Sequence, residues 1–240
     1  MNKLMIRFNI IAILSFLFLH SNPVFSQDTT VNKYGLHVIS AVDTYKKTIA
    51  SDHKKIMAAL IVEIPDAIYD LKYAGTGNFM HTKLYPDIPT TYMRLDASEA
   101  LSSVQRALKD QHMGIKIWDA YRPYSVTEKM WELVKDDRYA ADPKFGSGHN
   151  RGIAVDLTII DLSTGKELDM GTGFDNFSDT AHHDFKNLPA NVLQNRLVLR
   201  SVMEKHGFKA LETEWWHYYF INGKDYELLD IPFEELYRIQ

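Results

Sequence analysis

Apolar residues recur along the chain at two spacings, one that favours helices and one that favours strands. Residues 97–111 carry an apolar stripe at the helical spacing, made of Ala97, Ala100, Leu101, Val104 and Leu108. Asp96 and Glu99 stand at the start of this stripe in the arrangement of a capping box, so we expect Asp96 to cap the helix. A stripe of this kind packs into the core.

The same patterns predict two further helices and three strands. The helices cover residues 125–134 and a stretch from about Asn187 to Gly207, where the glycine ends the helix. The strands, which are rich in β-branched and aromatic residues, are predicted at residues 115–118, 153–160 and 214–221.

The order of these elements indicates the fold class. Helices and strands joined by short connections favour an α+β fold, with a small mixed or antiparallel sheet and helices packed on one side of it. Segments 60–64 and 67–73, broken by Pro65 and Gly75, are expected to be short strands or irregular structure. No repeat or linker interrupts the pattern, so residues 27–240 are expected to form a single domain.

The first residues resemble an export signal. Lys3 and Arg7 precede an apolar run over residues 10–19, which is shorter than the roughly 20 residues that span a bilayer. Residues 24–26 resemble a small-x-small cleavage site, so residues 1–26 are expected to be a signal peptide. The mature chain would then be periplasmic or extracellular, with no membrane span after processing. An uncleaved anchor is the alternative.

Composition limits the chemistry that the chain can carry out. The sequence contains no cysteine, which excludes disulfides, a thiol nucleophile and a thiolate metal site. Any metal must therefore be bound by His, Asp or Glu. The formal net charge of -4 gives no electrostatic attraction to nucleic acid, so we expect a small-molecule partner. The oligomeric state is not indicated.

A histidine and an aspartate frame the predicted strand at residues 153–160. Asp156 shares one face of that strand with the small Ala154, while the apolar residues share the other face, so space for a metal ion is expected beside Asp156. His149 reaches the same point only if the chain turns between them, and Gly152 permits that turn. Taken alone, such a pair is more often a structural hydrogen-bonded pair than a metal site.

The third ligand is expected at the start of the last predicted strand. His217 would bind the metal, and Glu214 would be the general base that takes a proton from a water activated by the metal. Residues three apart on a regular strand face opposite ways. Both side chains therefore meet one metal only if Glu214 lies in the turn before the strand.

An arginine completes the set of residues with predicted chemical roles. Attack on an amide builds negative charge on the carbonyl oxygen, and Arg122 is the expected stabiliser because a guanidinium stays charged. Asp119 would orient this arginine or receive a substrate amine. A surface salt bridge is the alternative role of Arg122. Ser147 does not lie in a nucleophile elbow, so we expect it to contact the substrate carboxylate or to tune His149.

These motifs resemble those of the VanX-type D-alanyl-D-alanine dipeptidases, within the wider D,D-peptidase and Hedgehog-like zinc fold. The resemblance is specific and spreads over residues 73–220. It is carried by Ser147, His149, Gly152, Ala154, Asp156, Glu214, Trp216 and His217, by residues 119–123, and more loosely by Tyr73, residues 78–79 and residues 170–175.

The resemblance implies a zinc enzyme (Zn2+) that hydrolyses D-alanyl-D-alanine to free D-alanine. It implies that His149, Asp156 and His217 bind the metal, that Glu214 is the base and that Arg122 supports the oxyanion. It also implies a cleft that admits a free dipeptide but not a polymer, with Tyr73 on the wall that recognises the substrate.

Three alternatives stay open at this point. A peptidoglycan D,D-carboxypeptidase or an L,D-endopeptidase would use the same residues on a larger substrate. A zinc-stabilised binding protein without catalysis is the non-enzymatic alternative, although the presence of Glu214 and Arg122 argues against it. His182 and His183 are competing ligands, but adjacent side chains on an extended chain diverge, so a structural role is expected for them.

Overall fold

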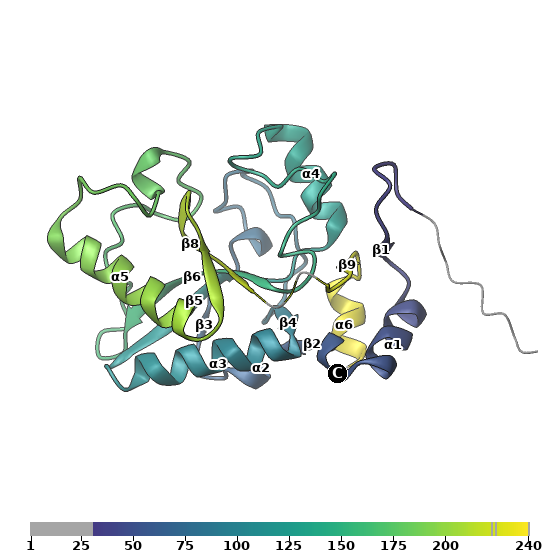
Figure 1. The fold of residues 1–240 in the computed structure, drawn as a ribbon, viewed down its shortest axis with the longest axis horizontal. Helices are drawn as coiled ribbons and strands as arrows, with labels where there is room; N and C mark the ends of the chain where they lie inside the picture. The colour runs from purple at the N-terminus through teal and green to yellow at the C-terminus, as the bar shows by residue number, and fades with distance from the viewer. Residues whose placement is uncertain (1–30, 222, 224, 240) are drawn as a thin grey trace, which may run out of the picture.

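A computed structural model describes residues 31–221, 223 and 225–239 of the chain (Figure 1). The predicted signal peptide, residues 1–26, lies outside the described residues. Among the described residues, no helix is both long enough and apolar enough to cross a membrane.

The main sheet has five strands in the order β3-β5-β6-β8-β7. Strand β3 runs parallel to β5, while the pairs β5–β6, β6–β8 and β8–β7 are antiparallel, so the predicted mixed sheet is confirmed. The strands are β3 (Ile68–Tyr69), β5 (Met113–Asp119), β6 (Ala154–Asp161), β7 (Phe208–Leu211) and β8 (Glu214–Phe220).

Two helices cover one face of this sheet. Helix α3 (Leu95–Lys109) and helix α5 (Ala190–Lys205) bury the apolar side chains of that face in one hydrophobic core. The predicted stripe residues Leu101, Val104 and Leu108 are fully buried there. Helix α4 (Tyr124–Val134) stands on the opposite side of the sheet from α3, together with long connecting loops (Figure 1).

A second core joins the two ends of the described chain. Helix α1 (Val42–Ser51) and helix α6 (Phe233–Ile239) pack together, and strand β1 (Val38–Ile39) pairs in parallel with β9 (Leu228–Leu229). A third small sheet pairs β2 (Met57–Ala59) with β4 (Tyr92–Arg94). Short 3-10 turns complete the structure at His53–Lys55, Lys72–Ala74 and Asp179–Ala181.

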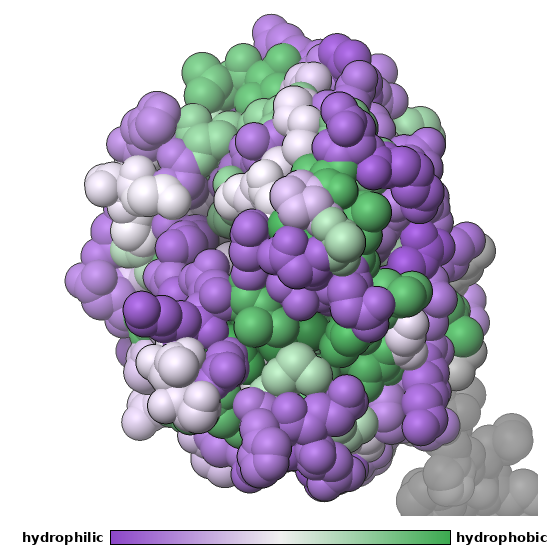
Figure 2. Space-filling view, turned by 90° about the vertical axis from the view of Figure 1, so that its left-hand side faces the viewer, coloured by the Kyte–Doolittle hydropathy of each residue, from purple (hydrophilic) through white to green (hydrophobic). Residues whose placement is uncertain are grey.

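The outer surface is largely hydrophilic. On the face drawn in Figure 2, hydrophilic side chains surround a smaller central region of hydrophobic ones. Large apolar side chains that are more than half exposed include Val62, Leu133, Phe145, Leu197 and Tyr237.

The predicted starts of two helices need correction. Helix α3 begins at Leu95, so its cap position is Arg94 and Asp96 lies within the first turn, where it accepts a hydrogen bond from the adjacent Ala97 N–H. The capping box does not form, because α3 follows β4 without a connecting loop. The Leu95 N–H donates to the Ile56 carbonyl instead. Helix α5 likewise begins later than predicted, at Ala190, because Pro189 occupies its cap position.

The early segments are mostly irregular, as expected, but one of them is helical. Leu60–Glu63 forms the single turn of helix α2, whereas Ile68–Tyr69 is a two-residue strand. Strand β7, which the sequence analysis did not predict, alternates buried and exposed side chains beside β8. Its four residues are too few to form a clear alternating pattern in the sequence. The segment is a strand because it pairs with β8.

The turn before β6 is fixed by Gly152. Its φ of +72° lies in the left-handed region, and a Cβ at this position would stand 2.6 Å from the side chain of the buried Met57. The Arg94 N–H donates to the Gly152 carbonyl at 2.8 Å, and the buried Arg94 guanidinium donates to the Arg151 carbonyl. The predicted turn is therefore confirmed, and it is docked against β2 and β4.

This turn yields a prediction with a matched control. Gly165 also has a left-handed φ, +68°, but a Cβ there would meet nothing within 4 Å. Gly165→Ala should therefore lower the free energy of unfolding by about 1 kcal/mol through backbone strain alone. Gly152→Ala adds overpacking against Met57, so its loss should be about 3 kcal/mol. Urea denaturation measures both, and equal losses would contradict this description of the turn.

Candidate metal centre

Three neighbouring strands place three polar side chains in a row. In the β5–β6 pair, a bulge between Ile117 and Asp119 adds one residue to β5, and Asp119 then lies opposite Asp156. In the β6–β8 pair, Asp156 lies opposite His217. Residues that lie directly opposite each other share a face of the sheet, so Asp119, Asp156 and His217 point to the same side.

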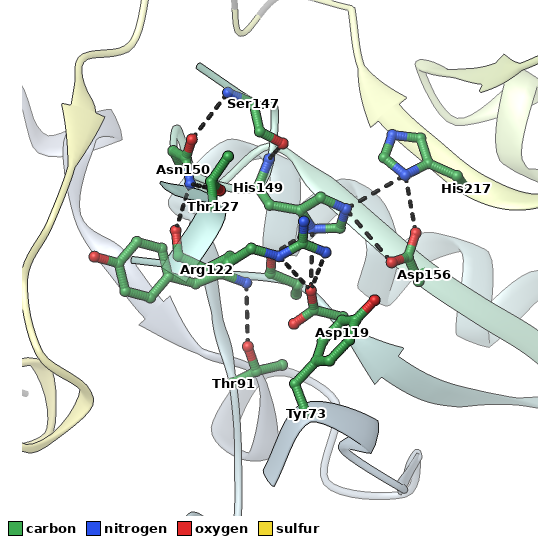
Figure 3. Close-up of polar contacts among 12 residues, drawn as sticks. Tyr73, Thr91, Asp119, Arg122, Thr127, Ser147, His149, Asn150, Asp156 and His217 are labelled. Carbon is green, nitrogen blue, oxygen red and sulfur yellow. Dashed lines mark hydrogen bonds and ion pairs between the residues drawn. The ribbon is translucent and has the colours of Figure 1, made fainter. Parts of the chain in front are cut away.

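The turn before β6 adds His149 to this row. The Ser147 hydroxyl accepts a hydrogen bond from the His149 N–H at 3.1 Å, which fixes the start of the turn. The His149 ring places Nδ1 2.6 Å from the Ala120 carbonyl, so Nδ1 carries the proton and donates. The lone pair of Nε2 is then free to face Asp156 and His217 (Figure 3).

Three potential ligand atoms converge on one point. The His149 Nε2 atom lies 3.3 Å from His217 Nδ1 and 3.4 Å from Asp156 Oδ2, and His217 Nδ1 lies 2.9 Å from Asp156 Oδ1. A tetrahedral site with metal–ligand bonds of about 2.0–2.1 Å has ligand–ligand distances of roughly 3.3 Å. These three side chains therefore fit a single divalent cation, and they are the only such group of His, Asp and Glu found among the described residues.

Charge within the cluster also favours a cation. Burial alone would raise the pKa of Asp156, but the adjacent His149 and His217 rings outweigh it and hold that pKa below its usual range. Burial would lower the pKa of His217, and Asp156 reverses that effect and raises it. A carboxylate that stays ionised in a buried site is the kind of ligand that a metal ion needs.

A second bulge aims Glu214 at the same place. The pairing of β7 with β8 is regular from Phe208 to Ala210, and Ala210 lies opposite Tyr218. The next residue of β7, Leu211, lies opposite Glu214, which is four residues before Tyr218 on β8. Glu214 is thus the first residue of β8 rather than part of a preceding turn. The predicted position in the turn is therefore wrong, and the bulge instead brings the Glu214 Oε2 atom to 3.8 Å from His217 Nδ1.

The pKa of Glu214 suits proton transfer. Burial raises it, with Asp156 and Asp175 adding to the rise and His217 opposing it, and the result is a pKa of about 7. A carboxyl group with a pKa near neutrality can both accept and donate a proton at physiological pH.

Arg122 is held in a fixed orientation from two sides. Its Nε and Nη2 atoms donate to Asp119 Oδ2 at 3.1 and 2.7 Å, and its guanidinium lies over the Tyr73 ring, 5.1 Å from the centroid. Asp119 is fully buried, and its other oxygen accepts a hydrogen bond from Tyr85. Of the two roles considered for Asp119, this geometry favours orienting the arginine over receiving a substrate amine.

Sequence reasoning missed two residues of the site. Asn150 donates to the Arg122 carbonyl at 2.9 Å and to Thr127 at 2.8 Å, and its side-chain oxygen accepts from Ser147 N–H (Figure 3). It therefore ties the His149 turn to the segment that carries Arg122. No pattern in the sequence indicates this role, because the bonds to Arg122 and Thr127 join positions more than 20 residues apart.

The other missed residue is Asp175. It lies at the end of residues 170–175, which resemble the dipeptidase sequences but indicate no role for this residue. Its Oδ1 accepts from the Tyr73 hydroxyl at 3.0 Å and its Oδ2 from Phe79 N–H at 3.4 Å. Burial, reinforced by the charge of Asp156, raises the pKa of Asp175 to about 7.

A cleft of about 280 Å³ opens beside the metal site. All the predicted site residues except the fully buried Asp119 line it, and the cleft also includes Asp175 and Phe79. His183 is placed elsewhere, next to the Tyr218 ring, and burial lowers its pKa to about 4.

Known proteins resemble the chain over most of its length. The sequence profile of the D-ala-D-ala dipeptidase family matches residues 54–235. A D-alanyl-D-alanine dipeptidase from Escherichia coli K12 is 34% identical over 170 residues, which cover 71% of this chain and 87% of that protein. Enzymes of the same name from Enterococcus faecium and Streptomyces coelicolor are 33% and 32% identical, covering 62% and 67% of this chain and 84% and 89% of theirs. The chain belongs to the D-ala-D-ala dipeptidase family.

Proposed function

We propose that this chain is a zinc-dependent dipeptidase that hydrolyses D-alanyl-D-alanine to two molecules of D-alanine. The observation that carries the proposal is the convergence of His149, Asp156 and His217 on one point, beside a carboxyl group with a pKa of about 7. The names of the three relatives support the choice of substrate.

The ligand set fits zinc better than calcium or magnesium. Two imidazole nitrogens and one carboxylate oxygen are typical zinc ligands, whereas calcium and magnesium prefer oxygen alone. Held by His149, Asp156 and His217, zinc would lower the pKa of a bound water to about 7 and would polarise the carbonyl group of the substrate. The hydrogen bond from His149 to the Ala120 carbonyl keeps the ring in the tautomer and orientation that ligation requires.

The chain's own residues supply the proton transfer and the charge stabilisation. Glu214 takes a proton from the attacking water and passes it to the leaving amine. Arg122 donates to the carbonyl oxygen as negative charge builds there, an effect typically worth about 2.7–4 kcal/mol in the transition state. Asp119 keeps the guanidinium aimed into the cleft, so little reorganisation is needed during the reaction.

The cleft has a polarity that matches a free dipeptide. Asp175, Glu214 and Asp156 give one part of it a negative character, and we place the substrate ammonium group at Asp175. Ser147 also lines the cleft, and we place the substrate carboxylate at its hydroxyl group. Binding an ammonium ion favours the ionised form of Asp175, which burial otherwise disfavours.

The size of the cleft bears on the alternatives. A D,D-carboxypeptidase or an L,D-endopeptidase would use the same chemistry, but a cleft of about 280 Å³ is small even for a ligand of drug size. A free dipeptide is therefore favoured over a peptidoglycan strand. We also propose that residues 1–26 direct export, which would place the enzyme outside the cytoplasmic membrane, in the compartment of the cell wall.

The function is tested by measuring release of D-alanine from D-alanyl-D-alanine. The zinc-loaded protein should release it, and removal of the metal with a chelator should abolish the release until zinc is restored. Glu214→Gln should lower kcat by at least 100-fold while the zinc content stays at one ion per chain, because the base is lost but the ligands remain. If the zinc-loaded protein left the dipeptide intact, the proposed function would be wrong.

The place of the substrate amine is tested with Asp175→Asn. This change removes the negative charge but keeps the size of the side chain, so KM for the dipeptide should rise about 10- to 100-fold, the loss expected for a charge-assisted hydrogen bond. Asp179→Asn is the control, since Asp179 lies four residues away and its side chain is 93% exposed. An unchanged KM in Asp175→Asn would place the amine elsewhere.

A further inference from the structure

Three aromatic rings from separate loops meet at one end of the cleft. The Phe177 ring lies 4.5 Å from the Tyr139 ring and 5.3 Å from the Phe79 ring, measured between centroids. Phe79 in turn meets the edge of the Tyr73 ring at 6.2 Å. We call Tyr139, Phe177 and Phe79 the aromatic bridge. It joins loops that are otherwise far apart in sequence, and all three rings are half-buried.

The aromatic bridge stands at the boundary between two cavities. Phe79 and Tyr139 line the cleft of about 280 Å³ that contains the metal ligands. Phe177 and Tyr139 line a neighbouring cavity of about 80 Å³, whose other walls include Asn176, Ser178 and His182. Glu214 lines both cavities, so the smaller one adjoins the reacting centre and continues the cleft beyond the aromatic bridge.

The aromatic bridge also lies next to the proposed position of the substrate amine. The backbone N–H of Phe79 donates to Asp175, and Phe177 follows Asp175 by two residues. An ammonium group bound at Asp175 would therefore lie near Phe79, whose ring contacts the Phe177 ring at 5.3 Å between centroids. A peptide with one more residue before this amine would need the space that Phe177 fills.

We propose that Phe177 sets the length of the substrate by closing the cleft on its amine side, so that peptides extended before the D-alanyl-D-alanine unit are excluded. This inference rests on the proposed function. Phe177 is the ring of the three that contacts both others, and so its removal breaks the aromatic bridge and joins the small cavity to the cleft. Phe79 is less suited to this role because its backbone also holds Asp175.

The test compares a free dipeptide with an extended one in the zinc-loaded enzyme. The substrates are D-alanyl-D-alanine and N-acetyl-D-alanyl-D-alanine, and the readouts are release of the C-terminal D-alanine and, for the acetylated peptide, its inhibition constant against dipeptide hydrolysis. Phe177→Ala should raise the ratio of kcat/KM for the extended over the free dipeptide at least 10-fold and lower the inhibition constant by a similar factor. The acetylated peptide lacks the ammonium group in assays of both the parent enzyme and the variant. A difference between the two enzymes in the ratio of kcat/KM therefore reports the space on the amine side of the cleft.

Matched variants separate this role from a structural one. Phe177→Trp keeps a ring in place and should retain the parent ratio, as should Tyr237→Ala, which removes a 71% exposed ring on α6. Phe177→Leu is the second opening variant, with a smaller rise, in case Phe177→Ala fails to fold in a thermal melt. An unchanged ratio and inhibition constant in the folded opening variants would overturn the proposal for Phe177 while leaving the proposed function intact. Failure of the parent enzyme to cleave the free dipeptide would overturn both.

Discussion

The strand register across β5, β6 and β8 is the constraint on which the rest of the site depends. It places Asp119, Asp156 and His217 side by side on one face, and it does so only because a bulge in β5 adds one residue before Asp119. Without that bulge, the regular pairing of Ile117 with Leu157 would continue and set Trp118 opposite Asp156. A bulge at the end of a strand is a common way to re-aim a side chain next to a functional site.

The end of β5 then organises two further groups. The Ala120 carbonyl orients the His149 ring, and Asp119 orients Arg122, so the proposed metal ligand and the proposed cationic donor are positioned from adjacent residues. Asn150 closes the arrangement, because it bonds the Arg122 carbonyl from within the His149 turn. A shift of one element would thus move the predicted ligands and the predicted stabiliser together. Such coupling holds a site within the small tolerances that catalysis demands.

The sequence predicted the parts of this site that depend on local spacing. The α+β fold, the three longest helices, the left-handed turn at Gly152 and the strand carrying Asp156 follow from residue periodicity and from the special backbone of glycine. Pairing across long distances could not be predicted in this way, because a register is decided by partners that the local pattern does not identify. The two bulges, the orientation of Glu214 and the roles of Asp175 and Asn150 all depend on such pairing, as do strands β1, β7 and β9.

The most direct test of the account is X-ray absorption at the zinc edge of the metal-loaded protein, which reports the atoms bound to the ion. We expect two imidazole nitrogens and two oxygen neighbours, one from Asp156 and one from water, at about 2.0–2.2 Å in a four-coordinate site. Asp156→Asn should weaken zinc binding without changing the number of imidazoles. A spectrum with three or more imidazoles, or with none, would contradict the claim that the strand register assembles this metal centre.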